Sequence, residues 1–477
     1  MSAAVASLPS SVDESTKKIE DASSSSSSSS AAPAPAPAQR RRKAEFQAVI
    51  LAGGYGANMY PLTEGTPKVL LPVANAPLIS YQIKLLQKAG VRDALVVTVR
   101  GEQELAIKEY LFRTAAGQFE GIDINVVGIE EQEDTVPVLR AIKDHIFTDF
   151  FLISGDLITE ASIHSLADAF RIRDASVVML LKELDVSKDA IKQRSRESNS
   201  IVDYVGLVRE RDSNAEHPRV LMLQSSTEDE ELAIPKSILK RHPNMEMRTD
   251  VSDAHLYVFR RWIMDLIVDK PGLSSVRNDL LPWLVRMQFA KGNAFGNAPP
   301  TLALRMSCNR LRATPANDLV RCYALVLKVK GPYCVRVNTV PSFTRANTEV
   351  RVHPVGPSTP WLKPESKLSP EHAKLFRKSL IDRGCVFGEK VALKNSVVGK
   401  HCKFGDGCKI NNCVIMDYVV IGAKAVLQNC VVCGNANVGD AAELNDCKIA
   451  ANGEAEAGEK LKGEIIARSV FEEFEFE

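Results

Sequence analysis

Long apolar runs, an apolar N-terminal segment and an excess of charge of either sign are all absent from this sequence. No apolar stretch approaches the roughly 20 residues of a membrane-spanning helix, which excludes an integral membrane protein of the helical class. The first residues do not form the apolar core of a secretory signal peptide. Lys and Arg number 60 against 59 Asp and Glu, a net charge of +1, so nothing favours nucleic acid or an acidic membrane as a direct partner.

Because a secretory leader is missing, the ten cysteines are predicted to be reduced thiols of a cytosolic protein rather than a disulfide framework. The 477 residues, 45% of them apolar, are enough for two or three globular domains. Residues 1–44 contain eight consecutive serines, Ser23–Ser30, and prolines alternating with alanines, which predicts a disordered Ser/Ala/Pro-rich tail. The basic run Arg40–Lys43 at its end is interpreted as a solvated linker end, with a nuclear address as the alternative.

Short apolar runs that alternate with helical patterns predict a doubly wound α/β domain over residues 45–346. One helix is predicted at Pro77–Ala89, with Asn75 as its N-cap and Gly90 as its stop. Ligands of such sheets bind beyond the carboxyl ends of the strands. The expected parallel strands are Phe46–Ala52, Ala94–Val99, Ile122–Ile129, Phe150–Ser154 and Ser176–Leu181.

Two loops at this rim carry residues suited to phosphate and metal chemistry. Gly53 and Gly54 directly follow the first strand, where their backbone N–H groups can approach a polyphosphate closely. Asp156 follows the fourth strand and is either a turn residue or a ligand for a divalent cation. The glycines alone also describe an ordinary turn, and they match neither a P-loop nor a dinucleotide fingerprint.

The stretch Leu51–Val73, LAGGYGANMYPLTEGTPKVLLPV, resembles the signature loop of the sugar-nucleotide pyrophosphorylases. The resemblance implies a nucleotidyltransferase-like fold in which Gly53, Gly54 and Lys68 contact a nucleotide. It also implies that Asp156 contributes to a magnesium site.

Asn58 stands where that family has an arginine. Asn is neutral and cannot form the bidentate fork of a guanidinium, so nucleotidyl transfer would lose one of its cations, at a cost of about 10²–10³ in rate. We therefore expect a degenerate pocket with no catalytic residue, no resident metal and at most vestigial nucleotide or sugar-nucleotide binding. His255 lies in an otherwise apolar strand and is interpreted as a core histidine rather than a catalytic one.

A strict 17-residue period begins at Phe387. Apolar residues recur at steps of six, five and six, which predicts three short strands per turn of a triangular solenoid. The pattern resembles the hexapeptide repeats of left-handed parallel β-helices, and the handedness follows from that resemblance alone. The apolar columns are Phe387, Phe404, Ile421 and Val438; Leu393, Ile410, Leu427 and Leu444; and Val398, Ile415, Val432 and Ile449.

The same register aligns the cysteines with small residues, so they are predicted to fill space. The Cys430–Cys433 pair has no second ligand pair and is weak evidence for a metal. His401 is the one histidine inside the repeat and is predicted to face solvent, which disfavours the acyltransferase function that such solenoids often serve. A polar column, predicted to form a ladder of stacked amides, consists of Asn395, Asn412, Asn429 and Asp446.

These patterns place the solenoid at residues 381–465. A proline-containing linker is predicted at 347–380, and an acidic aromatic tail at 466–477.

The combination of these two domains resembles the gamma and epsilon subunit family of the exchange factor eIF2B. The similarity is carried by Glu45–Val49, Ile153–Thr159, Arg171–Ser176 and Val335–Phe343. Only about 16 residues follow the last recognisable coil, too few for the helical exchange domain of the epsilon type, so the expectation is a gamma-type chain.

The resemblance implies a non-catalytic, cytosolic subunit of the complex that promotes GDP/GTP exchange on eukaryotic translation initiation factor 2. It implies pairing with the epsilon subunit and assembly with the alpha, beta and delta regulatory subunits. The alternative is an active GDP-mannose-type pyrophosphorylase that uses Lys68 and Asp156 with magnesium.

Overall fold

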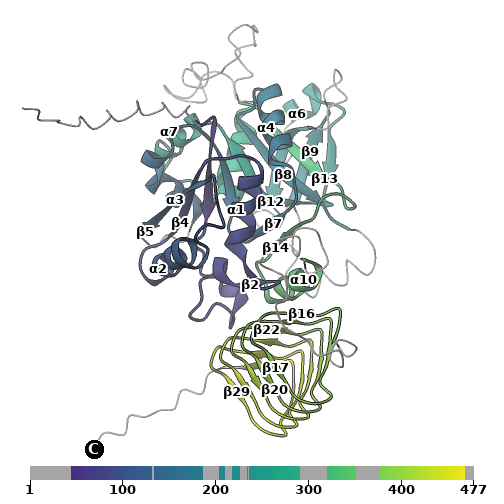
Figure 1. Cartoon of the computed structure of the whole chain (residues 1–477). Helices are drawn as coiled ribbons and strands as arrows, with labels where there is room; N and C mark the ends of the chain where they lie inside the picture. Colours follow the sequence, from purple (N-terminus) through teal and green to yellow (C-terminus); the bar gives the residue numbers. More distant parts are fainter. Residues whose placement is uncertain are drawn as a thin grey trace, which may run out of the picture. The chain divides into compact units, whose positions relative to one another are not determined.

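The computed structural model describes residues 44–130, 134–185, 203–209, 217–225, 234, 236–289, 320–350 and 376–467 (Figure 1). Residues 1–43 of the predicted N-terminal tail, with its basic run, most of the predicted linker and the acidic aromatic tail from residue 468 lie outside the described residues. Among the residues that are described, no helix has the length and apolar character to cross a membrane.

A ten-stranded sheet forms the centre of the α/β domain, in the order β11-β9-β10-β13-β8-β12-β6-β1-β4-β5. The predicted strands are found with ends that differ by no more than two residues. The strand bounds are β1 (Phe46–Leu51), β4 (Asp93–Val99), β5 (Asp123–Ile129), β6 (Asp149–Ser154), β8 (Val177–Glu183), β9 (Asp203–Val208), β10 (Arg219–Ser225), β11 (Glu246–Arg248), β12 (Val251–Phe259) and β13 (Cys322–Leu327).

The direction of one central strand differs from the predicted parallel arrangement. β1 runs parallel to both β4 and β6, as expected. β12, however, lies antiparallel between β6 and β8, so the sheet is mixed. An apolar run predicts that a strand is buried on both faces but does not determine its direction.

Helices cover both faces of the sheet, because alternate residues of each strand point to opposite sides. Along β1, Ala48 and Ile50 join one hydrophobic cluster, whereas Val49 joins the other. The first cluster is completed by α1 (Leu78–Lys88), α2 (Glu102–Glu109) and α4 (Ile163–Ile172). The second is completed by α3 (Thr135–Ala141), α7 (Trp262–Val268) and α8 (Leu281–Met287). The remaining helical segments are α6 (Lys236–Arg241), α10 (Val340–Val350), η1 (Ala57–Met59), η2 (Lys68–Leu70), η3 (Tyr110–Thr114), η4 (Lys143–His145) and η5 (Val276–Leu280).

Asn75 does not cap α1, and this expectation was wrong. The helix begins at Leu78, and Pro77 stands at its N-cap without a side-chain hydrogen bond. Asn75 instead lies with Ala74 in the two-residue turn between β2 (Pro72–Val73) and β3 (Ala76–Pro77), at φ 63° and 47° respectively. Asn adopts the left-handed conformation at low cost, which suits it to this turn. Its side chain donates to the carbonyl of Val398 at 2.9 Å.

A short antiparallel pair stands apart from the main sheet and brings a distant segment to its rim. β7 (Leu157–Thr159) pairs with β14 (Cys334–Arg336), and Arg336 lies opposite Leu157. α10 follows β14 and continues to Val350, beyond the predicted domain end at 346.

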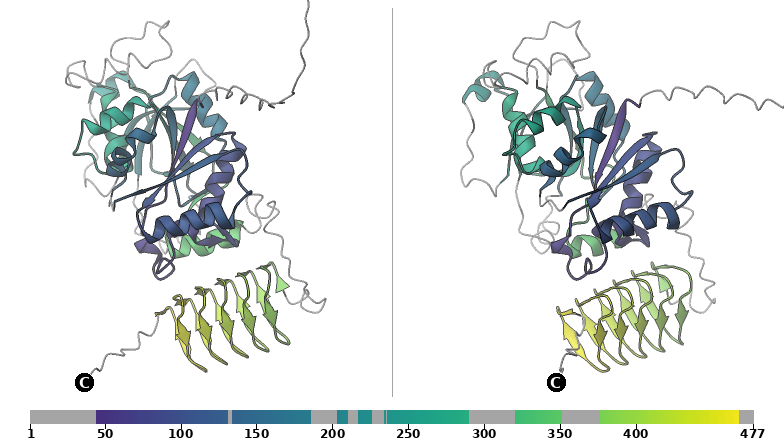
Figure 2. Two further views of the ribbon diagram at one scale, coloured as in Figure 1. Left: turned by 60° about the vertical axis from the view of Figure 1, so that its left-hand side comes forward. Right: turned by 90° about the vertical axis from the view of Figure 1, so that its left-hand side faces the viewer.

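The C-terminal strands form a stack of parallel coils (Figure 2). Their pairing has the predicted 17-residue register. Leu393, Ile410, Leu427 and Leu444 pair in successive coils and are buried. Its first paired residues, Phe376 and Arg377, lie ahead of the predicted start at 381. One sheet contains β15 (Phe376–Arg377), β18 (Ala392–Lys394), β21 (Lys409–Asn411), β24 (Val426–Gln428), β27 (Glu443–Asn445) and β30 (Lys460–Lys462).

The other two faces of the solenoid are sheets of two-residue strands. The second sheet contains β16 (Leu380–Ile381), β19 (Val397–Val398), β22 (Val414–Ile415), β25 (Val431–Val432), β28 (Lys448–Ile449) and β31 (Ile465–Ile466). The third contains β17 (Val386–Phe387), β20 (Lys403–Phe404), β23 (Val420–Ile421), β26 (Asn437–Val438) and β29 (Glu454–Ala455).

Backbone conformation, in addition to side-chain stacking, explains why Asn and Asp occupy the polar column of the solenoid. Asn395, Asn412, Asn429 and Asp446 all have φ between 50° and 56°, a left-handed conformation that Asn and Asp tolerate better than most residues. Asn412 also donates its amide to Asn429 Oδ1 at 2.8 Å, as expected for a ladder.

The solenoid cysteines pack in its interior as predicted. Cys402, Cys408, Cys413, Cys430 and Cys447 are buried, and every cysteine that the structure describes is a free thiol. His401 is exposed, as predicted, and its ring stacks on that of Tyr418 in the next coil.

Candidate nucleotide pocket

The candidate pocket lies where the carboxyl ends of β1 and β6 adjoin. Leu51 pairs with Ser154, and the Gly155 N–H donates to the Leu51 carbonyl at 2.9 Å. A Cβ on Gly155 would lie 2.6 Å from Val69 Cγ1 and 2.7 Å from the Leu51 oxygen, so only glycine permits this approach. Because Gly155 packs closely against Leu51, the next residue, Asp156, lies at the rim of the sheet.

The glycine-rich loop positions Lys68 against that carboxylate. Gly56 has φ 68°, and a Cβ there would lie 3.0 Å from Thr63 Cγ2 and 3.3 Å from Lys68 Cδ. Glycine therefore serves both a left-handed turn and the close passage of the lysine side chain. Thr63 fixes the same turn by donating its hydroxyl to the Gly56 carbonyl at 3.2 Å.

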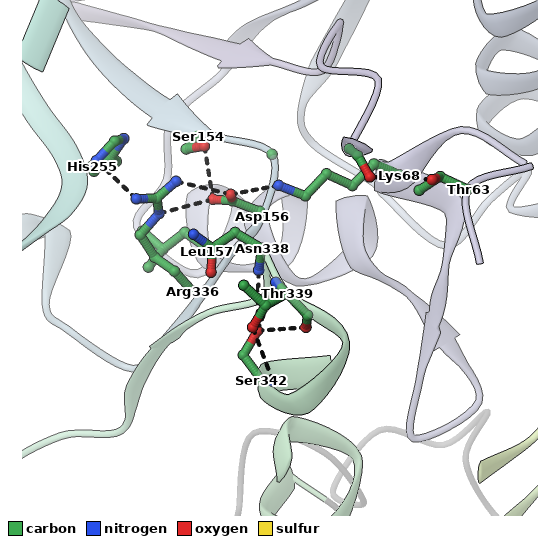
Figure 3. A network of polar contacts seen from close by, with 12 residues as sticks. Thr63, Lys68, Ser154, Asp156, Leu157, His255, Arg336, Asn338, Thr339 and Ser342 are labelled. Atoms are coloured by element: carbon green, nitrogen blue, oxygen red, sulfur yellow. Dashed lines mark hydrogen bonds and ion pairs between the residues drawn. The ribbon is translucent and has the colours of Figure 1, made fainter. Parts of the chain in front are cut away.

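The Asp156 carboxylate is buried and accepts four hydrogen bonds from side chains of the chain itself (Figure 3). Lys68 Nζ lies 2.7 Å from Oδ2, and Ser154 Oγ donates to Oδ1 at 2.8 Å. Arg336 donates twice, from Nη2 to Oδ2 at 3.0 Å and from Nε to Oδ1 at 3.2 Å. An ionised carboxylate offers about four lone-pair positions, so all of them are used.

The charge balance at this carboxylate keeps it ionised. Burial by itself raises the pKa of Asp156, but the charges of Arg336 and Lys68 outweigh burial and hold that pKa well below its usual value. The bidentate arginine contributes hydrogen bonds that favour the charged form as well.

The residues at this site do not fit the magnesium ion that the fold family implies. A divalent cation at Asp156 would have to displace Lys68 or Arg336, because no lone pair of the carboxylate is unused. Over the described ranges, no group of three or more His, Cys, Asp or Glu side chains is placed to hold a metal. The Lys68 and Arg336 cations occupy the positions around the carboxylate that a metal would need.

His255 interacts with the arginine rather than filling the core alone. It lies in a bulge of β12, between Asp253 and Tyr257, with φ 56°. Its Nε2 lies 2.9 Å from Arg336 Nη1, and because guanidinium only donates, Nε2 is the acceptor and the ring is neutral. Burial and then the charge of Arg336 lower the pKa of His255 well below its usual value.

A second arginine, Arg277, borders the same site. It comes from η5 and donates through Nη2 to both oxygens of the buried Asp203, each at 2.7 Å. Ser275 caps this helix by accepting from the N–H of Asn278, and Thr135 accepts from the N–H of Val276 at 2.8 Å.

These elements enclose a cavity of about 180 Å³. Of the residues predicted for the pocket, Gly54, Lys68 and Asp156 line it. Gly53, two residues after the end of β1, does not, and Asn58 lies exposed on η1 and is not a lining residue. The wall also includes Thr135, Ser154, His255, Tyr257, Ser275 and Arg277.

Arg336, Arg277 and Thr135 are site residues that sequence reasoning missed, and Arg336 is the one that contacts Asp156 directly. The segment Val335–Phe343 was noticed only as part of a family resemblance. A charged residue inside the apolar run Cys334–Val337 was the available signal, since a strand that carries a buried arginine needs an acidic partner. Nothing in the local pattern indicates which acidic residue that partner is.

Comparisons with known proteins agree with both halves of this architecture. A family model described as Nucleotidyl transferase matches residues 47–189, and a model described as the EIF2B subunit epsilon LbH domain matches residues 362–459. The fold prediction of an α/β nucleotidyltransferase-like domain followed by a left-handed β-helix is confirmed.

Two gamma subunits align with most of the chain. Translation initiation factor eIF2B subunit gamma of Dictyostelium discoideum is 29% identical over 343 residues, which are 65% of the chain and 75% of that protein. The gamma subunit of Schizosaccharomyces pombe is 28% identical over 370 residues, 74% of the chain and 73% of that protein. The chain is a homologue of the eIF2B gamma subunits.

An enzymatic relative matches a smaller part of the chain. The UTP–glucose-1-phosphate uridylyltransferase AglF of Haloferax volcanii is 32% identical over 139 residues, 29% of the chain and 55% of that protein. The homology to gamma subunits is therefore the more extensive, while the nucleotidyltransferase domain itself is shared with enzymes.

Proposed function

We propose that the chain is a non-catalytic gamma-type subunit of the guanine-nucleotide exchange factor complex that acts on eukaryotic translation initiation factor 2. The observation that carries the proposal is the saturated carboxylate of Asp156. Homology to gamma subunits over most of the chain supports the assignment to the complex.

The absence of nucleotidyl transfer follows from charge. Such a reaction needs cations that are free to act on the transferring phosphoryl group. Lys68 and Arg336 instead occupy the carboxylate that would bind the metal cation, and Asn58 supplies no charge where the pyrophosphorylases have an arginine. We propose that Gly53, Gly54, Lys68 and Asp156 are the vestige of a nucleotide pocket without a resident metal or cofactor.

We propose that the epsilon subunit is the direct partner, and that the alpha, beta and delta regulatory subunits complete a cytosolic assembly. In this proposal the α/β domain, predicted at 45–346, extends through α10 to Val350, and the β-helix, predicted at 381–465, begins at Phe376 and includes Ile466. Solenoid faces are extended binding surfaces in general, which suits a subunit whose role is to organise others.

The enzymatic alternative is tested by incubating the purified full chain with mannose 1-phosphate, GTP and magnesium. An authentic GDP-mannose pyrophosphorylase in the same buffer serves as the positive control. We expect no pyrophosphate above the level of a reaction without protein. Sustained release at ordinary enzyme rates would refute the non-catalytic assignment.

The assembly is tested by affinity purification of the tagged chain from its native cells. We expect the epsilon subunit, the three regulatory subunits and initiation factor 2 among the recovered proteins. Recovery of the chain without epsilon would show that it does not belong to this complex.

A further inference from the structure

Hydrogen-bond donors that the Asp156 network does not use gather around the 180 Å³ cavity. Lys68 has three N–H groups, and its one hydrogen bond within the described part of the chain goes to Asp156. Arg277 engages Asp203 through Nη2 alone, so its Nε and Nη1 donate to no residue in the described part of the chain. Both side chains line the cavity wall.

Neutral donors add to these cations. His255 accepts through Nε2, which leaves its proton on Nδ1, and no described residue accepts from that nitrogen. Thr135 accepts a hydrogen bond from the Val276 N–H but donates its own hydroxyl to no described residue. Both residues line the cavity, so its wall presents N–H and O–H groups without acceptors for them.

The charged side chains that line the cavity sum to a net positive charge. Lys68 and Arg277 are cationic, whereas Asp156 is the single anionic side chain among the lining residues, and its lone pairs are used. A wall with a net positive charge and spare donors favours an anion with several acceptor oxygens.

The size of the cavity limits the class of anion. Pockets for drug-sized ligands, a class that includes nucleotides, measure about 300–1,000 Å³. At about 180 Å³ this cavity lies below that range. We propose that it binds a small oxyanion of the size of phosphate, held by Arg277, Lys68, His255 and Thr135, rather than a sugar nucleotide. The inference deepens the proposed function, since it gives the non-catalytic site a ligand.

Calorimetric titration of the purified full chain with sodium phosphate tests the inference, with sodium chloride at matched ionic strength as the reference. We expect saturable binding with phosphate and none with chloride. Equal responses to both salts would overturn the proposal. Because the assay involves no turnover, its result is independent of the pyrophosphate-release test.

Arg277→Lys is the informative variant, because it keeps a cation beside Asp203 while removing the spare guanidinium donors. We expect phosphate affinity to fall at least tenfold. Arg286→Lys, at an exposed position on α8, is the matched control and should bind as the parent does. If Arg277→Lys also binds as the parent does, the assignment of the site is wrong. A double variant, Asp203→Asn with Arg277→Gln, removes both partners together, and we expect it to fold and to lose binding.

Two further titrants define the ligand. If mannose 1-phosphate competes with phosphate, the natural ligand is a phosphate monoester. If it does not compete, the ligand is the free phosphate ion. The size limit would be refuted if GTP displaced phosphate and had the higher affinity of the two.

Discussion

Arg336 and Asp156 form a two-point ion pair, with Nε 3.2 Å from Oδ1 and Nη2 3.0 Å from Oδ2, although 180 positions separate them in the chain. The pair joins the short β7–β14 ribbon to the end of β6, and Lys68 completes it from the glycine-rich loop. In this arrangement, the residue that resembles a metal ligand is a structural carboxylate.

The first prediction concerns the stability that this pair provides. Arg336→Leu leaves the buried Asp156 with one cation fewer, and removal of one partner from a buried pair costs about 3–5 kcal/mol. The midpoint of urea unfolding, followed by tryptophan fluorescence to which Trp262 and Trp283 contribute, measures the loss. Arg113→Leu, which removes an exposed pair with Glu109, should cost less than about 0.5 kcal/mol. Equal midpoints for Arg336→Leu and the parent would contradict the prediction.

The second prediction concerns the lost arginine of the signature loop. Asn58→Arg restores the cation of the pyrophosphorylase pattern but leaves Asp156 saturated by Lys68 and Arg336. We therefore expect the variant to release no pyrophosphate from GTP and mannose 1-phosphate with magnesium. Turnover by Asn58→Arg alone would show that the internal ion pairs do not block the reaction. Asn437→Arg, on the solenoid, controls for the added charge.

The third prediction concerns pH. The folded chain keeps His255 neutral because burial and Arg336 lower its pKa well below 6.5, whereas the unfolded chain protonates it near that value. The unfolded state therefore binds more protons below pH 6.5, and stability falls on acidification. From pH 6.5 to 5.5 this histidine removes about 1 kcal/mol of stability, because the unfolded ring is already half protonated at pH 6.5.

A series of urea titrations between pH 7.5 and 5.5 measures this dependence. His255→Gln should lose the corresponding part of the slope, while the exposed control His164→Gln should keep it. Parallel slopes for the parent and His255→Gln would disprove the assignment of the slope to this ring.

The fourth prediction contrasts two glycines. A methyl group on Gly155 would meet Val69 Cγ1 and the Leu51 carbonyl well inside van der Waals contact, so Gly155→Ala should cost about 1–3 kcal/mol or more. Gly272 has no atom within 4 Å of such a methyl group, and Gly272→Ala should be neutral or slightly stabilising. Differential scanning calorimetry compares the two variants. Similar Tm values for both would show that the end of β6 is less tightly packed than described.

The fifth prediction separates backbone strain from side-chain stacking in the solenoid. Asn429 has φ 53° and accepts from the Asn412 amide. Asn429→Ala loses the hydrogen bond and strains the left-handed turn, at a cost of about 1–2 kcal/mol. Asn429→Gly loses the hydrogen bond alone and should cost less. Thermal unfolding followed by circular dichroism ranks the two, and the reverse order would exclude strain as the cause.

The solenoid was the most predictable part of the molecule. A fixed period repeats the same environment in every coil, so one register places Leu427 and its column neighbours in the core without any knowledge of distant contacts. The position of Asp156 after a buried strand was predictable for the same reason, because only local pattern is needed.

Features that depend on distant partners were not predictable. The direction of β12 is fixed by its neighbours β6 and β8, and the role of Asn75 by the hairpin turn and Val398. The four donors to Asp156 include Arg336, which the fold brings from β14. Local propensity contains no information on such pairings.

The strict register of the β-helix also means that its length changes in whole coils. If the 17 residues that follow Leu393 are removed, Leu393 takes the place of Ile410 and pairs with Leu427. Every remaining side chain then stays on its own face of the solenoid. Removing a single residue shifts each following strand by one place and turns a buried aliphatic column toward water. An evolving gene can therefore lengthen or shorten this domain by duplicating or deleting complete 51-nucleotide units, three nucleotides for each of the 17 residues, while smaller in-frame changes are confined to the turns between strands.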